Sequence, residues 1–344
     1  MDTTKEILKK YWGFDSFRPK QEGIINDLIN GKDVFALLPT GGGKSLCYQL
    51  PALMKEGITI VISPLISLMQ DQVSQLNQKG IKAICINSGM NYREIDNALD
   101  NVRYGDYKFL YVSPERLQTK IFIERFKLIK IGFIIVDEAH CISQWGHDFR
   151  PSYKQINQLR HIKPDIPIAA FTATATKHTK EDIIKELELK SPEIHEASFV
   201  RENIAYRIFK SEAKKRRIIE FCTTLRQSTG IIYCQTRKSV KEVSQLLNYE
   251  KISCASYHGG MNREDREKAM NSWMDESSKI MVATNAFGMG IDKPDIRFVI
   301  HYDVPKSLEG YYQETGRAGR DGQTSYCHLF YNQKIAGTYQ WLAN

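Results

Sequence analysis

Short apolar, β-branched runs alternate with amphipathic stretches from one end of the chain to the other. Each run is followed by a turn signal and then by a helical pattern. Continuous apolar runs of this length are typical of a parallel sheet that helices cover on both faces. In the first half the predicted strands are Val34–Leu38, Ile58–Ile62, Phe109–Val112, Phe133–Val136 and Ile168–Phe171.

The same alternation starts again in the second half. The further predicted strands are Ile204–Phe209, Gly230–Cys234, Ser253–Tyr257, Ile280–Ala283, Phe298–His301 and Tyr326–Phe330. Neither periodicity is clear near Ser198–Asn203. We therefore predict two α/β domains, residues 1–200 and 201–344, joined by a short hinge.

Composition supports this interpretation and excludes some classes of protein. The chain has 344 residues, 42% hydrophobic and 26% charged, which is enough for two globular domains with their own cores. No apolar run approaches the roughly 20 residues of a membrane helix, and Met1–Lys10 lacks the apolar centre of a signal peptide. We expect no membrane partner. The net charge of +8 fits a polyanionic partner but is spread along the chain.

The seven cysteines include no C-x-x-C pair and lie mostly inside apolar runs. This pattern favours buried free thiols in a reducing compartment over disulfides or a structural zinc site.

A glycine-rich segment lies between the first predicted strand and a helix expected to start near Lys44. Three consecutive glycines allow the backbone to fold around a phosphate at a helix N-terminus. Lys44 would pair with the β and γ phosphates, and the Ser45 hydroxyl would bind Mg²⁺. The alternative is a turn without a ligand, and Leu38 stands where the full motif has glycine. The segment comprises Thr40, Gly41, Gly42, Gly43, Lys44 and Ser45.

Two carboxylates directly follow the predicted strand Phe133–Val136. Asp137 would bind Mg²⁺, and Glu138 would orient and deprotonate the attacking water, because phosphoryl transfer depends on positioning and charge neutralisation. The alternative is a solvated acidic loop.

Arg317 and Arg320 lie three residues apart in a glycine-containing segment. They could form a solvated basic helix face. The glycines favour a tight turn, and we interpret the arginines as fingers that reach nucleotide across an interdomain cleft.

With these residues in place, the chain resembles RecQ-family DNA helicases of superfamily 2, over essentially its whole length and with the motifs in order. The resemblance implies two RecA-like domains with an ATP cleft between them. Phe14, Arg18 and Gln21 resemble the family's adenine-reading motif, in which Phe14 would stack on the base.

The segment Ser143–Pro151 resembles the aromatic-rich loop by which RecQ proteins couple strand binding to ATP hydrolysis. Trp145 or Phe149 would meet bases; core packing is the alternative, but their neighbours are polar. Gln144 could sense the γ-phosphate, and His147 would belong to the coupling relay. Arg150 could pair with an acidic neighbour or contact phosphate, and both remain open.

Other motifs also match the family. His140 is expected to hydrogen-bond between motifs rather than bind metal. By resemblance, Gly290 and Asp292 would bind nucleotide. The remaining expected DNA-binding or coupling residues are Ser63, Pro64, Thr172, Thr236, Arg237, His258 and Thr284.

The resemblance implies a 3′–5′ DNA helicase or translocase of DNA repair and recombination, with ATP and Mg²⁺ as cofactors. Single-stranded, forked or partial-duplex DNA would be its partner, and the protein would be a monomer in the compartment that holds the DNA, cytoplasm or nucleus. By the resemblance, we expect no zinc-binding, winged-helix or C-terminal accessory domain of the family in this chain, and therefore weak unwinding. It could be a shortened or a naturally minimal form. The alternatives are an RNA-remodelling ATPase and a strand-binding module.

Overall fold

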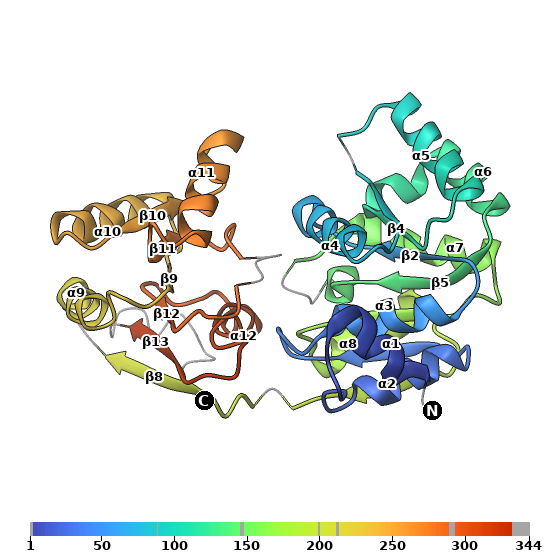
Figure 1. The fold of residues 1–344 in the computed structure, drawn as a ribbon. Coiled ribbons are helices and arrows are strands. Elements are labelled where there is room, and N and C mark those ends of the chain that lie inside the picture. The colour runs from blue at the N-terminus through green and yellow to red at the C-terminus, as the bar shows by residue number, and fades with distance from the viewer. Residues whose placement is uncertain are drawn as a thin grey trace. The chain divides into compact units, whose positions relative to one another are not determined.

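The computed structural model describes residues 3–87, 89–144, 148–198, 200–210, 213–288 and 293–331. The chain divides into two compact units, residues 1–199 and 200–344 (Figure 1). Each unit is an α/β fold built on one parallel sheet.

The first unit contains a seven-stranded sheet in the order β3-β4-β2-β5-β6-β1-β7, in which all paired strands are parallel. Its strands are β1 Val34–Leu37, β2 Ile58–Ile62, β3 Ala83–Ile86, β4 Phe109–Val112, β5 Ile131–Val136, β6 Ile168–Thr172 and β7 Glu193–Glu196. Its α-helices are α1 Thr3–Trp12, α2 Gln21–Ile29, α3 Lys44–Met54, α4 Ile66–Gln78, α5 Tyr92–Tyr104, α6 Lys120–Leu128, α7 Asn157–Ile162 and α8 Lys177–Glu186. Three 3₁₀ helices complete the unit: η1 Pro114–Gln118, η2 Ala139–Ile142 and η3 Pro151–Ile156.

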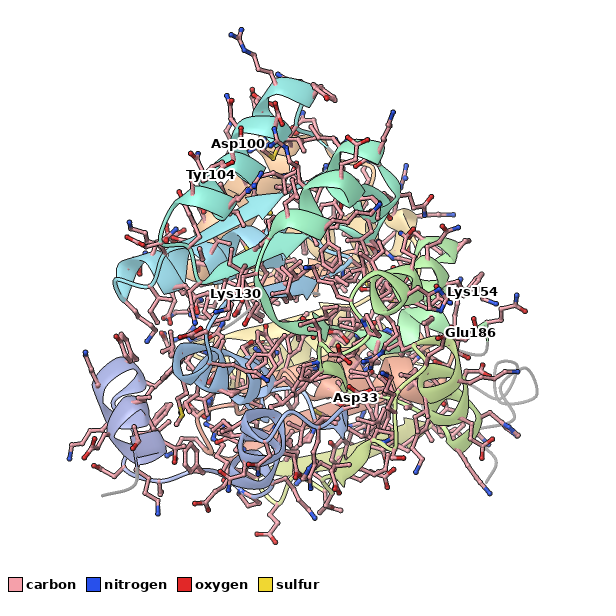
Figure 2. All side chains as sticks on the ribbon, turned by 90° about the vertical axis from the view of Figure 1, so that its right-hand side faces the viewer. Asp33, Asp100, Tyr104, Lys130, Lys154 and Glu186 are labelled. Carbon is pink, nitrogen blue, oxygen red and sulfur yellow. The ribbon has the colours of Figure 1, made fainter. Side chains whose placement is uncertain are left out.

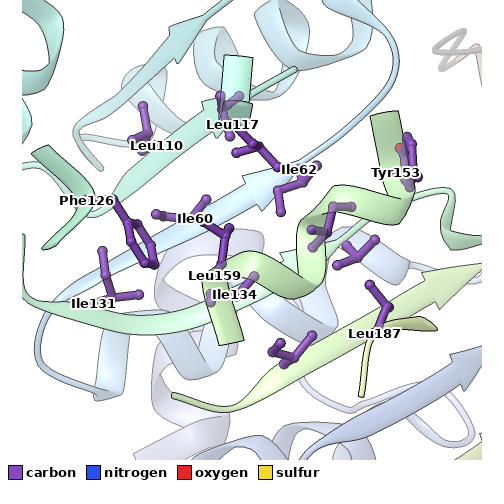
Figure 3. Close-up of a cluster of buried hydrophobic side chains, with 14 of the residues drawn as sticks. Ile60, Ile62, Leu110, Leu117, Phe126, Ile131, Ile134, Tyr153, Leu159 and Leu187 are labelled. Carbon is purple, nitrogen blue, oxygen red and sulfur yellow. The ribbon is translucent and has the colours of Figure 1, made fainter. Parts of the chain in front are cut away.

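Alternate residues of each strand enter two different hydrophobic cores. In β1, Phe35 and Leu37 pack with α5, α6 and α8, whereas Val34 and Ala36 pack with α2, α3 and α4. This alternation follows from the two-residue period of a strand whose two faces are both covered. Figure 3 shows part of the first core, in which Phe126 of α6 and Leu159 of α7 pack near Ile60 and Ile134 of the sheet.

The second unit repeats this plan with six parallel strands in the order β10-β11-β9-β12-β13-β8. One face packs against α9 and α10, and the other against Trp273 of α11, which is fully buried. The strands are β8 Ile204–Lys210, β9 Gly230–Tyr233, β10 Cys254–Tyr257, β11 Ile280–Ala283, β12 Phe298–His301 and β13 Ser325–Tyr331. The helices are α9 Lys214–Thr224, α10 Arg237–Tyr249, α11 Arg263–Met274 and α12 Leu308–Thr315.

Every predicted strand is present, and α3 begins at Lys44 as expected. The sequence did not predict β3 and β7. All seven cysteines are free, and five of them are buried. Within the described ranges, no helix has the length and apolarity needed to cross a membrane.

A buried ion pair ties the sheet of the first unit together. Asp33, just before β1, is 5% exposed and pairs with Arg160 of α7, which is 4% exposed. Two backbone N–H groups also contact the Asp33 carboxylate: Ile168 donates to Oδ1 at 2.8 Å, and Lys190 donates to Oδ2 at 2.7 Å. Figure 2 labels Asp33 among the side chains of this unit. One carboxylate therefore anchors α7, the start of β6 and the segment before β7.

We predict that Asp33→Asn destabilises the first unit by about 3–5 kcal/mol, because it leaves the Arg160 charge buried without its counter-ion. The matched control is Glu186→Gln, which removes a partly exposed pair whose Lys154 Nζ lies 3.9 Å from Glu186 (Figure 2). The control substitution should lower the free energy of unfolding by less than about 1 kcal/mol. Hydrogen exchange of first-unit peptides along a urea series measures the loss of stability in both variants. Peptides of the second unit serve as the internal reference. Equal losses in the two variants would contradict a special role for Asp33.

Candidate nucleotide and nucleic-acid site

The segment between β1 and α3 has a shape that depends on glycine. Gly43 is the N-cap residue of α3 with φ +76°, and a Cβ there would collide with the Gln21 amide. A Cβ on Gly42 would come within 2.9 Å of the Pro39 carbonyl oxygen. The loop backbone therefore packs too closely against its neighbours to accept side chains at these two positions, and it ends on the N-terminus of a helix. This arrangement suits an anion such as phosphate.

The residues of the expected adenine-reading motif brace this loop. Arg18 donates from Nη1 to the Gly41 carbonyl at 2.6 Å. The Gln21 amide lies 3.3 Å from the Gly42 carbonyl and accepts from the Arg18 N–H at 2.9 Å. Phe14 is 52% exposed, so its ring is accessible for stacking. The structure therefore brings this motif and the glycine-rich loop together, with Arg18 and Gln21 contacting protein carbonyls.

The acidic pair lies at the carboxyl end of β5. Asp137 is 8% exposed, and its N–H donates to the Ile62 carbonyl at 2.9 Å, which extends the pairing of β5 with β2. Glu138 adopts left-handed backbone angles, φ 48° and ψ 45°. Its Oε1 lies 3.9 Å from Lys44 Nζ. The structure thus places Lys44 and Glu138 next to each other.

Burial raises the pKa of Asp137 to about 7; the neighbouring Glu138 carboxylate also raises it, and Lys44 opposes the shift. A buried carboxylate with a raised pKa gains from a nearby cation, because the charged form is poorly solvated. Carboxylate and hydroxyl oxygens are also ligands that Mg²⁺ prefers. Asp137 and Ser45 therefore fit a magnesium ion bound together with phosphate.

His140 connects two motifs, as the sequence predicted. Its Nδ1 lies 3.0 Å from the Thr172 Oγ1, which also donates to the Thr174 carbonyl at 3.0 Å. Thr172 is fully buried, so the DNA-contact part of its prediction does not fit this structure. The reason is that Thr172 ends a central strand, where its hydroxyl hydrogen-bonds with His140 and Thr174. A part for Thr172 in coupling hydrolysis to strand binding, through its contact with His140, remains a proposal.

Ser63 and Pro64, which follow β2, are likewise buried. The Pro64 carbonyl accepts from Arg150 Nη1 at 3.0 Å, and Arg150 Nη2 lies 3.3 Å from Asp148 Oδ2. Pairing with an acidic neighbour was one of the two alternatives for Arg150, and the structure shows this pairing. Through Arg150 the segment after the predicted aromatic-rich loop contacts the segment after β2.

The aromatic-rich loop itself is described only at its ends. Gln144 is exposed, and Phe149 is half-buried with Lys154 Nζ 5.9 Å from its ring centroid. Trp145 and His147 lie outside the described residues.

In the second unit, predicted motif residues follow the carboxyl ends of neighbouring strands. Thr236, after β9, caps α10 by accepting from the Ser239 N–H at 3.0 Å. Arg237 packs on Gly260, and His258, after β10, is half-buried. Thr284, after β11, is 7% exposed, which leaves little surface for a direct DNA contact because its position continues a buried strand. Gly290 and Asp292 lie outside the described residues.

Arg317 and Arg320 lie in a turn segment after α12, which excludes the helical basic face. Arg317 is 4% exposed, and its guanidinium donates to the Gly288 carbonyl and interacts with Tyr233. Arg320 is partly exposed. The two arginines therefore differ in burial: the turn places Arg317 against Gly288 of its own unit, whereas Arg320 keeps accessible surface, and the finger role of both stays a prediction.

Two buried tyrosines contact the site although the sequence did not single them out. The Tyr48 hydroxyl interacts with the Ser45 hydroxyl, and the Tyr153 hydroxyl donates to the Asp137 carbonyl at 2.9 Å. A tyrosine in an apolar position carries no sequence signal for such a contact, because it has the same pattern as a core residue.

Comparisons with known proteins agree with this geometry. Residues 18–183 match the DEAD/DEAH box helicase family, and residues 213–322 match the helicase conserved C-terminal domain. Similar folds include S. cerevisiae Dbp5 bound to RNA and ADP BeF3, at a TM-score of 0.76 and 20% identity over 98% of this chain and 90% of that chain. Fold and motifs define tandem RecA-like domains of the helicase type, as predicted.

The sequence relatives identify the family. The chain is 44% identical over 340 residues to the ATP-dependent DNA helicase RecQ of Pasteurella multocida, covering 99% of this chain and 53% of that protein. It is 45% identical over 331 residues to the putative ATP-dependent RNA helicase R290 of Acanthamoeba polyphaga mimivirus, covering 95% and 60%. The chain belongs to the RecQ family of DEAD/DEAH-box helicases. It spans little more than half the length of these two relatives.

We predict that Gly43→Ala weakens nucleoside triphosphate binding by at least about tenfold, equivalent to about 1.4 kcal/mol. The added Cβ would combine a left-handed backbone with a collision against Gln21. Gly80→Ala is the matched control, since Gly80 has φ +77° but nothing within 4 Å of an added Cβ. Calorimetric titration with a non-hydrolysable ATP analogue and Mg²⁺ measures the dissociation constant. Unchanged binding by Gly43→Ala would show that the loop does not hold phosphate.

Proposed function

We propose that this chain is the motor of a DNA helicase that hydrolyses ATP in response to single-stranded DNA. The observation that carries the proposal is the pair Asp137–Glu138 at the end of β5, with Asp137 buried and Glu138 3.9 Å from Lys44 at the start of α3. Together with the glycine-rich loop, this pair supplies the charges that phosphoryl transfer from a nucleotide requires. Membership of the RecQ family supports DNA as the activating strand.

Each residue of the site has a proposed role in hydrolysis. The glycine-rich loop from Thr40 and the N-terminus of α3 would hold the phosphates, with Lys44 paired to the β and γ groups. Ser45 and Asp137 would hold Mg²⁺, which supplies charge neutralisation on the phosphate oxygens. Glu138 would orient the attacking water and accept its proton, and Phe14 would stack on the base.

The second unit would complete the reaction. We propose Arg320 as the arginine that reaches the γ-phosphate, because it keeps exposed surface, and Arg317 as a residue that holds the Gly288 carbonyl. Gly290 and Asp292 are proposed nucleotide contacts. ATP would then bridge two units, and hydrolysis would remove the bridge.

DNA would lie along both units and contact mainly its phosphates. Arg237 is exposed and Phe149 is half-buried, so both can meet a strand together with Trp145. Stacking on aromatic rings is worth roughly 1–3 kcal/mol per base and tolerates any sequence. We therefore propose little sequence preference, single-stranded or forked substrates, and a role in DNA repair and recombination.

RNA is the second candidate strand. The relative named a putative RNA helicase is as similar to this chain as the RecQ protein. The same site chemistry would serve either strand, so the identity of the activating strand has to be measured.

The first test is steady-state ATP hydrolysis with and without single-stranded DNA or RNA of equal length. We expect DNA to stimulate hydrolysis, and Glu138→Gln to lower the stimulated rate by about 10²–10⁴-fold while nucleotide binding is kept, because a general base contributes that much. Glu186→Gln, on the surface of α8, serves as the control and should hydrolyse ATP like the parent chain. Stimulation by RNA alone would assign the chain to RNA remodelling. Hydrolysis that is indifferent to both strands would exclude a strand-coupled motor.

A second prediction concerns direction and unwinding. We propose 3′–5′ movement, and weak strand separation by this chain alone because strand contacts confined to two units limit its grip on a fork. Partial duplexes with a 3′ or a 5′ tail, short or long, measure both properties. We expect slow separation of short duplexes with a 3′ tail. Robust unwinding of long duplexes would contradict the weak-unwinding proposal, and a requirement for a 5′ tail would contradict the direction.

A further inference from the structure

The Tyr153 side chain joins the hydrophobic core of the first unit to the acidic pair. It lies on η3, is fully buried and packs with the cluster in Figure 3 that includes Ile62 and Leu187. Its hydroxyl donates to the Asp137 carbonyl at 2.9 Å. Burial raises the pKa of Tyr153 well above its usual value, so the hydroxyl stays protonated and remains a donor at neutral pH.

This hydrogen bond acts on the peptide group between the two carboxylates. The carbonyl of that peptide accepts from Tyr153, and its N–H donates to Asp137 Oδ1 at 3.0 Å. Both polar atoms of one peptide plane are therefore held by side chains. The orientation of this plane sets ψ of Asp137 and φ of Glu138, and thus the direction in which each carboxylate points.

The backbone at this peptide needs such support. Glu138 has φ 48°, a left-handed conformation that costs a residue with a side chain roughly 1–2 kcal/mol. A conformation of this cost persists where surrounding contacts over-determine it, and such residues cluster at functional sites. The Tyr153 hydroxyl supplies a contact to the carbonyl of this peptide, and the hydrophobic core holds the Tyr153 ring in place.

Tyr153 also lies close in sequence to the end of the predicted coupling loop, with Ser152 between it and Pro151. Its N–H donates to the Arg150 carbonyl at 3.0 Å, and the Arg150 N–H donates to the Cys141 carbonyl at 2.8 Å. The end of the loop is thereby tied to η2 on one side and, through the Tyr153 hydroxyl, to Asp137 on the other. A displacement of the loop end would reach the peptide between the carboxylates through these bonds.

We propose that Tyr153 is a positioning residue, whose hydroxyl holds the Asp137–Glu138 peptide in the orientation required for hydrolysis and connects it to the end of the 143–151 loop. The inference rests on the proposed ATPase function. An ordinary buried hydroxyl that merely satisfies a carbonyl would contribute to stability alone, and the two roles have different measurable consequences.

The test is Tyr153→Phe, which removes the hydroxyl and keeps the ring. We expect kcat of DNA-stimulated ATP hydrolysis to fall at least fivefold, with KM and the dissociation constant for a non-hydrolysable ATP analogue unchanged. Ser244→Ala is the matched control: Ser244 of α10 is buried in the second unit, and its hydroxyl also donates to a backbone carbonyl, that of Val240, at 2.7 Å. Its kcat should stay within twofold of the parent value.

Thermal unfolding of both variants and hydrogen exchange of peptides covering 137–143 complete the experiment. Melting close to the parent, with faster exchange in 137–143 and a lower kcat in Tyr153→Phe alone, supports the positioning role. An unchanged kcat, an equal loss in both variants, or a large fall in melting temperature with the Tyr153 change would overturn it. A parent chain without DNA-stimulated hydrolysis would instead refute the proposed function, which separates the two failures.

Discussion

Every functional element of this protein depends on the burial of both faces of its parallel sheets. A strand covered on both sides has few positions for a polar side chain, so the charged residues of the site come where strands end. In a parallel sheet these carboxyl ends meet at one edge. In the first unit, hydrogen bonds of the sheet continue past the strand ends: Asp137 N–H donates to the Ile62 carbonyl at 2.9 Å, and Leu38 N–H donates to the Thr172 carbonyl at 3.1 Å. The loops that carry the chemistry are thus held by the sheet itself.

The same burial determines the electrostatics of the site. Taking Asp137 out of water raises its pKa, and the adjacent Glu138 raises it further. The partner cation is Lys44, 3.9 Å from Glu138. At an effective dielectric constant of about 20, two unit charges about 4 Å apart attract by about 4 kcal/mol. A phosphate bound at the glycine-rich loop, as proposed, would compete with Glu138 for that lysine and would link nucleotide binding to the interactions of the carboxylate.

The sequence predicted the parts of the fold that follow from hydrophobic runs and missed those that do not. β7 reads Glu-Ile-His-Glu and lies at the sheet edge with alternating exposure, so it contains no apolar run. β3, at the other edge, is a short Ala-Ile-Cys-Ile run with two half-buried residues. Edge strands are covered less completely than central ones, and their sequences are accordingly less apolar.

Within the site, the sequence predicted which residue types take part better than it predicted their burial and their contacts. The glycines, Lys44 and the acidic pair have chemistry that their spacing alone indicates, and the structure brings Lys44 and Glu138 together. The burial of Arg317 was not predictable in this way, because it depends on how a turn folds onto Gly288, far away in sequence. Contacts of this kind come from tertiary packing, which no local pattern records.

Two 3₁₀ helices anchor the described ends of the 143–151 segment. η2 follows the acidic pair and η3 follows the loop, and a main-chain bond from Arg150 to Cys141 closes the base between them. The Arg150 side chain meanwhile reaches the Pro64 carbonyl after β2. These bonds tie the end of the segment to the residues after β2 and to η2, which follows the acidic pair, so a displacement of Arg150 would reach residues next to both carboxylates.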